Sequence, residues 1–220
     1  MELLDYLYAH FYSEAQLTKY CDVTKQRFTE LQALGVMPKP SYILNAHIGC
    51  RSFFGNHEQN ADINFYPKTY KQWLNKMKLN KKREDAFHCF NTRMQQTIQA
   101  LSNKGISSNY KNGTKEQAKF IEIQWQHFLE GTYGLCTRTG LPEDIAQKEI
   151  TIDYINMLLA QQKLNDKEEK QLISAMNILA SCSPKFAPHE RGKSQFHQLA
   201  KRIKPDISDQ IKAFNLPMDD

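Results

Sequence analysis

The sequence has few of the patterns that mark membrane or secreted proteins. Its 220 residues contain no apolar run of the length that crosses a bilayer, about 18 residues or more, so no membrane partner is expected. The opening residues carry Glu2 and Asp5, where a signal peptide needs basic side chains. We therefore expect a cytoplasmic location.

Cysteine is also scarce, and its five copies include no Cys-x-x-Cys pair. An odd, scattered set argues against a disulfide framework and a four-cysteine zinc site. His47, Cys50 and His57 form one His-x-x-Cys…His set, but it supplies at most three of the four ligands that zinc requires. No metal and no cofactor is predicted.

Charged residues are unevenly distributed along the chain. The net charge of +5 conceals two strongly basic blocks. Residues 1–83 and 183–204 each carry +5, whereas 84–182 and 205–220 carry −2 and −3. The stretch 63–83 holds seven basic residues, no acid and several aromatic residues. Basic residues interleaved with aromatics are typical of a surface for a polyanion, although a solvated helix face explains them equally well.

Helical spacing dominates the chain, with glycine and proline confined to a few joints. Ser13 and Gln16 form a capping box, and Thr24 is the N-cap candidate for a helix from Lys25 to Leu34 that stops at Gly35. Between Pro40 and Pro67 the pattern predicts short strands at 41–44 and 63–66, separated by a long tip that Gly49 and Gly55 break. Later stripes predict a helical bundle, with helices starting at Pro142 and after Asn165 and further helices near 188–203 and 206–214.

The segment 15–42 predicts a helix-turn-helix. Two short helices flank the turn at 22–24, and Leu17 and Val23 are spaced to pack against Phe28 and Leu31. In such a unit the second helix enters the major groove of double-stranded DNA. The residues predicted to contact nucleic acid are Lys25, Gln26, Arg27, Arg51, Lys68 and Lys71.

This region, roughly residues 13–80, resembles the winged helix-turn-helix of MerR-type transcription regulators. The likeness rests on Val23, Thr24 and Phe28, on the run Leu34-Gly-Val-Met-Pro38, and on Phe65-Tyr66 before a further helix. It implies DNA binding, a β-ribbon wing and a homodimer that pairs half-sites. Asp22 replaces the turn glycine of that family, and Thr29 stands where it usually has a phosphate-clamping Arg, so use of the unit for protein contacts stays open.

The glycine-rich segment 128–142 carries the candidates for catalysis. Cys136 lies in this loop ahead of an acidic helix start, and His189 is the candidate remote base. An enzyme of this kind requires Tyr133, Cys136, Arg138 and His189 in one pocket. A small buried cysteine is the alternative interpretation.

Over nearly its whole length the chain resembles an uncharacterised bacterial family of unknown function that is associated with natural-product biosynthesis. The likeness rests on the segments 38–42, 52–55, 128–142 and 187–190. It brings no established reaction or fold.

These observations predict a mainly α protein with an N-terminal MerR-like winged helix-turn-helix and a small β-ribbon wing, followed by a C-terminal helical bundle. The expected regions are 1–105 and 114–220, joined by the turn-rich linker 106–113. The leading interpretation is a DNA-binding regulator of a bacterial pathway. The alternatives are a small accessory enzyme that uses Cys136 and a protein-interaction adaptor that binds no DNA.

Overall fold

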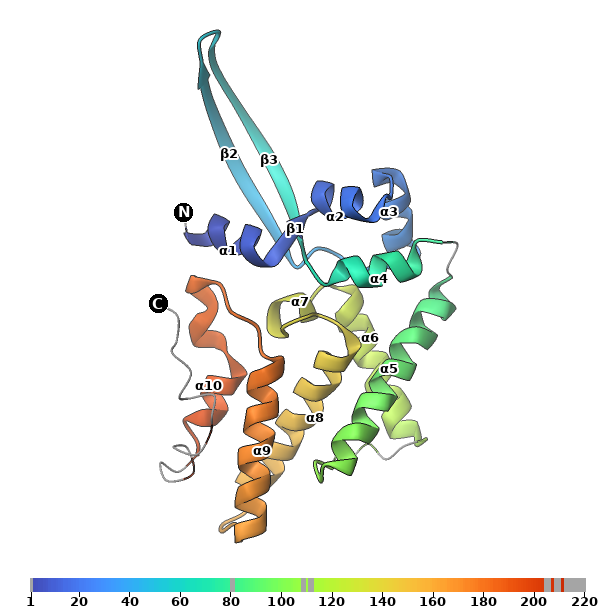
Figure 1. Cartoon of the computed structure of the whole chain (residues 1–220), viewed down its shortest axis with the longest axis vertical. Coiled ribbons are helices and arrows are strands. Elements are labelled where there is room, and N and C mark those ends of the chain that lie inside the picture. Colours follow the sequence, from blue (N-terminus) through green and yellow to red (C-terminus); the bar gives the residue numbers. More distant parts are fainter. Residues whose placement is uncertain are drawn as a thin grey trace.

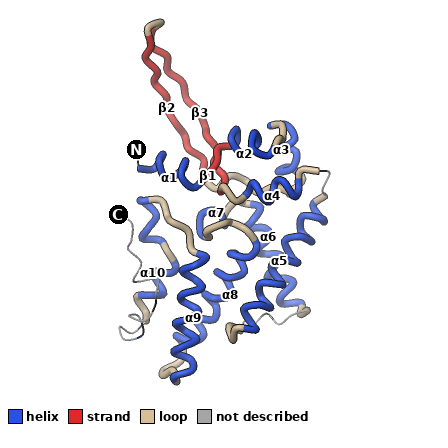
Figure 2. Tube along the Cα trace, viewed as in Figure 1, coloured by secondary structure: helices blue, strands red, loops and turns tan. Residues whose placement is uncertain are grey.

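The structure is a computed structural model that describes residues 2–79, 82–107, 110, 113–203, 207 and 211. The fold is mainly α-helical, with one small three-stranded antiparallel sheet near the N-terminus (Figures 1 and 2). The N-terminal elements are α1 (Glu2–His10), β1 (Phe11–Ser13), α2 (Glu14–Cys21), α3 (Lys25–Ala33), β2 (Tyr42–Ser52), β3 (Gly55–Pro67) and α4 (Tyr70–Met77).

The two short helices α2 and α3 begin where the local sequence predicts. The Ser13 hydroxyl accepts a hydrogen bond from the amide of Gln16, whose side chain accepts one from the Ser13 amide, and the Thr24 hydroxyl accepts one from the amide of Arg27. Such caps satisfy the first amides of a helix. Asp22 adopts the left-handed conformation, with φ of 53°, which an Asp tolerates better than most residues.

The β ribbon is much longer than the sequence patterns suggest. β2 and β3 pair without interruption from Tyr42↔Phe65 to Ser52↔Gly55, which leaves Phe53 and Phe54 as a two-residue tip. The prediction of a long broken tip is therefore wrong: Gly49 pairs within the ladder, and Gly55, with φ of 123°, starts the returning strand. At about 3.3 Å per residue the ribbon extends roughly 36 Å, and it projects from one end of the molecule (Figure 1).

Strand β1 pairs with the base of β3, so the order in the sheet is β1-β3-β2. Here the ribbon is covered by α1, and Leu7, Phe11 and Phe65 form a small separate core. Further out, the ribbon has no covering element among the described residues, and both strands are exposed from His47 to Gln59.

The remaining helices form the bundle that the apolar stripes predict. They are α5 (Arg83–Asn103), α6 (Lys115–Leu129), α7 (Tyr133–Cys136), α8 (Pro142–Leu159), α9 (Asp166–Cys182) and α10 (Gln195–Ala200), with a 3₁₀ helix η1 at Pro188–Lys193. α8 lies between α5 and α9, and α10 packs on α9 (Figure 1). Proline at the start of α8 and the Asn165 cap of α9 are confirmed.

The expected linker and the two helices expected near the C-terminus differ in how they compare with the structure. The single helix expected near 188–203 is wrong, because η1 and α10 are separate and meet at Ser194. Apart from Ile207 and Ile211, which are buried, the helix expected at 206–214 lies outside the described residues, as does part of the linker 106–113. No helix in the described ranges has the length and apolarity to cross a bilayer.

A single large core joins the N-terminal helices to the bundle. Trp73 of α4 lies 4.9 Å from Phe128 and 6.3 Å from Trp125, measured between ring centroids. The Trp73 indole N–H donates to the Val36 carbonyl oxygen at 2.9 Å in a buried hydrogen bond. Buried side chains of α2, α3 and α4 belong to the same core cluster as those of the bundle helices, so these N-terminal helices are packed on the bundle rather than tethered to it.

Candidate functional site

The first candidate surface is the exposed face of α3. The Lys25 side chain is 84% exposed, and Gln26 and Thr29 are exposed beside it, whereas Phe28 and Leu31 are buried on the opposite face. Arg27 is partly buried, and its guanidinium lies 3.2 Å from the Glu30 carboxylate. The face is therefore accessible, as groove binding requires, but acidic side chains accompany its two cations.

Lys68 and Lys71 face elsewhere. The Lys68 ammonium donates to the Ala9 carbonyl oxygen at 2.7 Å and lies over the Tyr12 ring, and the Lys71 ammonium lies over the Tyr20 ring. The Tyr12 and Tyr20 rings themselves lie 4.8 Å apart, between centroids. These lysines belong to the side formed by β1, α2 and α4.

The aromatic residues of the basic stretch 63–83 have a structural role. Phe65, Tyr66, Tyr70 and Trp73 are buried, with exposed fractions of 1% or less. The aromatic residues of this stretch therefore do not share a surface with its exposed lysines, so the part of the polyanion interpretation that rests on them is wrong. It contains the end of a strand and an amphipathic helix whose aromatic face lies in the core.

Arg51 lies near the ribbon tip, opposite Asn56, and is exposed. Arg51 is the one Lys or Arg residue of the ribbon, and the ribbon also carries two acidic residues, Glu58 and Asp62. The ribbon thus has little electrostatic attraction for phosphate groups. Its histidines form no metal set, since no three His, Cys, Asp or Glu side chains in the described part of the chain are placed to hold an ion.

The glycine-rich loop is a packing joint between the bundle and the β sheet. A Cβ atom at Gly131 would lie 2.7 Å from the carbonyl oxygens of Lys39 and Pro40, and one at Gly134 would lie 2.0 Å from Ser41 Oγ. The Ser41 hydroxyl donates to the Gly131 carbonyl oxygen at 2.9 Å. Glycine allows close backbone approach at these positions.

Cys136 lacks the surroundings of an activated thiol. Cys136 ends the four-residue helix α7 and donates to the Thr132 carbonyl oxygen at 3.5 Å, and burial raises the pKa of its thiol. A reactive cysteine requires the opposite shift. His189 lies on η1, 3.9 Å from the Glu190 carboxylate, and is exposed.

The neighbours of Cys136 are engaged in a polar network inside the bundle. The Tyr133 hydroxyl donates to Gln124 and lies 3.1 Å from Glu149, and the Lys148 ammonium donates to the same carboxylate at 2.7 Å. Burial and the Glu149 charge raise the pKa of Tyr133. These groups satisfy one another, which favours a structural role.

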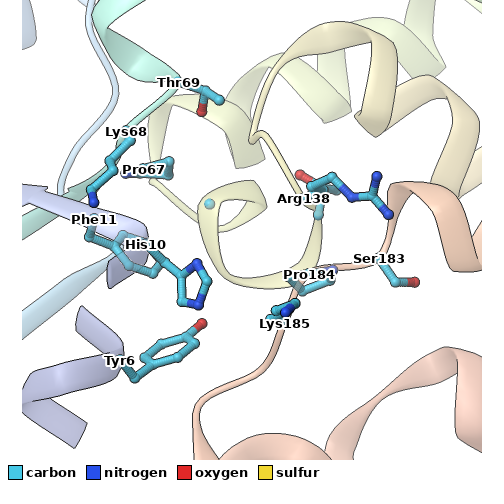
Figure 3. Close-up of a pocket in the computed structure, with 12 residues that line it drawn as sticks. Tyr6, His10, Phe11, Pro67, Lys68, Thr69, Arg138, Ser183, Pro184 and Lys185 are labelled. Carbon is cyan, nitrogen blue, oxygen red and sulfur yellow. The ribbon is translucent and has the colours of Figure 1, made fainter. Parts of the chain in front are cut away.

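A cavity of about 470 Å³ lies where α1, the β3–α4 connection, the glycine-rich loop and the segment after α9 meet (Figure 3). Of the four residues that the enzyme interpretation places in one pocket, Arg138 lines this cavity, and the other three are not among its lining residues. The lining residues are Tyr6, His10, Phe11, Pro67, Lys68, Thr69, Gly134, Thr137, Arg138, Ser183, Pro184 and Lys185.

The cavity wall is basic and partly aromatic. The His10 ring lies 5.0 Å from the Tyr6 ring, between centroids, and Figure 3 shows the Arg138 guanidinium directed away from both. Burial and the charges of Lys185 and Lys68 lower the pKa of His10. The lining contains no carboxylate.

The segments that meet around this joint come from distant parts of the chain. The Tyr42 hydroxyl donates to the Glu190 carboxylate at 2.5 Å, and the Lys39 amide donates to the Leu129 carbonyl oxygen at 2.8 Å. Three of the four segments that carry the whole-chain resemblance, 38–42, 128–142 and 187–190, are thus joined here.

Comparison with known protein families gives one match: the sequence model of a family of unknown function, DUF6058, covers residues 86–207. The chain belongs to the DUF6058 family. The DUF6058 region begins in the first turn of α5 and includes the glycine-rich loop, α8, α9 and α10. No curated protein and no solved structure matches the chain.

The DUF6058 region supplies one wall of the cavity, and the N-terminal residues outside it supply the other. Sequence reasoning missed His10, Tyr6 and Lys185. Lys185 does lie in the basic block 183–204, but no periodicity or spacing connects it with His10.

Proposed function

We propose that the chain is a DNA-binding regulator that uses α2 and α3 as a helix-turn-helix and the β2–β3 ribbon as its wing. The supporting observation is the accessible face of α3, on which Lys25, Gln26 and Thr29 are exposed while Phe28 and Leu31 fix the helix to the core. The order of the elements, which is α1, β1, α2, α3 and then the β2–β3 hairpin, also supports the proposal. The proposal retains the MerR-type likeness, the homodimer and the link with bacterial natural-product pathways.

The charges near α3 set the expected strength of binding. Lys25, Arg27 and Arg51 are the cations available for phosphate contacts, and Glu14 and Glu30 lie within 4 Å of the first two. With about −0.9 per phosphate contact, three contacts give a slope of log K against log salt of about −2.7 per protomer. The salt dependence should therefore be moderate.

The test is a fluorescence anisotropy titration of the full chain with duplex genomic fragments at several salt concentrations. We expect the double variant Lys25→Gln/Arg27→Gln to bind more weakly and to reduce the magnitude of the slope by about 1.8 per protomer. Lys115→Gln/Lys119→Gln removes the same charge from exposed positions on α6 and should leave binding unchanged. Absence of binding at low salt, or equal losses in the two double variants, refutes the proposal.

The ribbon favours a second candidate, a protein-interaction adaptor. Phe53 and Phe54 at the tip are 97% and 95% exposed, and their rings contact each other 5.4 Å apart between centroids. The face that carries Ala46, Ile48 and Cys50 is also uncovered. A two-stranded ribbon alone has marginal stability in water, so a protein partner on this face would stabilise it.

Sedimentation velocity of the full chain tests whether that partner is a second copy. If it is, Phe53→Ser/Phe54→Ser should dissociate the oligomer, whereas Ile43→Ser, at an exposed position near the ribbon base, should not. A monomer at all concentrations excludes self-association through the tip. Tip-dependent association without DNA binding favours the adaptor over the regulator.

A further inference from the structure

We propose that the ribbon tip of one copy of the chain inserts into the cavity between α1 and the glycine-rich loop of a second copy, which inserts its own tip in return. This arm exchange names the contact that holds the homodimer together, so it rests on the self-association included in the proposed function. It does not depend on DNA binding.

The ribbon tip is an apolar projection far from the rest of the molecule. Phe53 and Phe54 are 97% and 95% exposed, and residues 52–56 carry no charge. The paired strands hold the two rings about 36 Å from the base of the sheet, at about 3.3 Å per residue. Because burial of an aromatic ring away from water is favourable, such a tip favours insertion into a pocket.

The cavity has the space and the apolar wall that two rings require. A cavity of about 150 Å³ holds one benzene molecule, so the volume of about 470 Å³ accommodates both phenylalanine rings. The rings of Tyr6 and Phe11 line it, 5.9 Å apart between centroids, together with two prolines. The Lys68 ammonium donates to a backbone carbonyl oxygen at 2.7 Å, and the Arg138 guanidinium is directed elsewhere (Figure 3). The rings and prolines thus form the wall available to an apolar side chain.

The apolar face of the ribbon leads from α1 towards the tip. Tyr42 and Leu44 are half-buried and pack on the small core beneath α1. Alternate residues of a strand share a face, so Ala46, Ile48 and Cys50 continue this face towards the tip, and the last two are exposed. When the outer parts of this face pack together in two antiparallel ribbons, each tip reaches the base of the other ribbon, beside α1. The cavity lies there, because α1 contributes part of its lining.

Charges of opposite sign accompany the tip and its site. Arg51 precedes Phe53 by two residues and is exposed. Glu2 and Asp5 are exposed on α1, and Asp5 is next to the cavity residue Tyr6. With the tip beside α1, the guanidinium of one copy and the carboxylates of the other attract each other, which favours this arrangement over a contact between two tips.

The area buried by the exchange is sufficient for a stable dimer. An aromatic side chain buries about 150–250 Å², so the four phenylalanines of two tips bury roughly 600–1,000 Å². The cavity walls lose a similar area, which brings the total to the roughly 1,200–2,000 Å² of a stable interface. The exchange is also reciprocal, as in most homodimers with a two-fold axis.

Mixing two variants that do not dimerise alone tests the exchange. Phe53→Ser/Phe54→Ser removes the tip. His10→Trp places a larger ring in the cavity, because His10 is exposed on α1 and Figure 3 shows its ring directed into the space between Tyr6 and Lys185. We expect each variant to raise the dissociation constant of the dimer at least about hundredfold in sedimentation velocity. In the mixture the tip of one chain meets the intact cavity of the other, so native mass spectrometry should detect the heterodimer by its mass.

Two matched variants control for the substitutions. Lys119→Trp adds the same new ring at an exposed position of α6, and Ile43→Ser changes an exposed residue on the opposite face of the ribbon. Both should dimerise like the wild type. If the tips contacted each other, His10→Trp would dimerise normally and the mixture would contain no heterodimer.

A photochemical cross-link locates the tip on the second copy. With p-benzoylphenylalanine in place of Phe54, a mixture of isotope-labelled and unlabelled chains should give cross-links between chains, to α1 or to residues 183–185. If His10→Trp is not folded by circular dichroism, the cross-link decides alone.

Four results would overturn the arm exchange. They are a wild-type chain that is monomeric up to about 100 μM, a dimer that either variant leaves equally tight, a mixture without heterodimer, and cross-links only to other segments. None of these measurements contains DNA. A monomer that binds DNA through α3 therefore refutes the exchange and leaves the DNA-binding regulator standing, whereas a dimer that binds no DNA does the reverse.

Discussion

The substitution Gly134→Ala tests whether the glycine-rich loop is a packing joint. The new Cβ would lie 2.0 Å from Ser41 Oγ and 2.6 Å from Pro67 Cγ. The hydroxyl can rotate away only by losing its hydrogen bond to the Gly131 carbonyl oxygen, and the proline ring is fixed at the end of β3. The structure therefore predicts a steric cost at this position.

Its magnitude follows from three contributions. Overpacking of this kind costs about 1–3 kcal/mol, and loss of the Ser41 hydrogen bond adds about 1 kcal/mol. Alanine is better than glycine in a helix by up to about 1 kcal/mol, which offsets part of the cost in α7. We expect Gly134→Ala to lower the free energy of unfolding by about 1–3 kcal/mol.

Urea unfolding, followed by the fluorescence of the two buried tryptophans, measures this change. Gly49→Ala is the matched control, because a Cβ there has nothing within 4 Å, and alanine in a strand should stabilise by about 0.5–1 kcal/mol. Adding Ser41→Ala to Gly134→Ala should restore only part of the loss, since the Pro67 contact remains. A Gly134→Ala protein as stable as the wild type would refute the assignment of the loop as a packing joint.

Two further predictions concern titratable groups. Because the pKa of His10 is lowered in the folded state, the unfolded state binds more protons below about pH 6.5, so His10 should cost stability as the pH falls. His10→Gln should therefore lose less stability than the wild type between about pH 7.5 and about pH 5.5, and equal losses in urea unfolding would contradict this. Burial raises the pKa of the Cys136 thiol, whereas Cys50 is exposed on the ribbon. Iodoacetamide should therefore label Cys50 first in a mass-spectrometric time course, and faster labelling of Cys136 would reopen the enzyme interpretation.

The sequence predicts helix starts well, because a cap depends on a few adjacent residues. Ser13, Thr24 and Asn165 all cap the helices expected of them. The sequence also predicts that α2 packs against α3, because the apolar residues that join them, such as Leu17 and Phe28, lie close together in the sequence.

The ribbon and the cavity depend on contacts that spacing does not contain. Gly49 is a strand breaker by composition, but it pairs in register because the antiparallel ladder continues on both sides of it. From the sequence, the aromatic residues of the stretch 63–83 suggest a nucleic-acid-binding surface. Only the tertiary structure shows that they are core residues, with Trp73 packed on Phe128. The cavity combines residues near positions 10, 68, 138 and 185, which only the tertiary fold brings together.

The packing of Trp73 against Trp125 and Phe128 has a consequence for the DUF6058 family. The family match starts at residue 86, after the helix that carries Trp73. A DUF6058 region separated at that boundary would lose the ring that covers one side of Trp125 and Phe128, and exposed apolar surface promotes aggregation. We therefore expect the family segment to fold poorly without its N-terminal partner, and a relative with a different N-terminal region would need another apolar side chain in the position of Trp73.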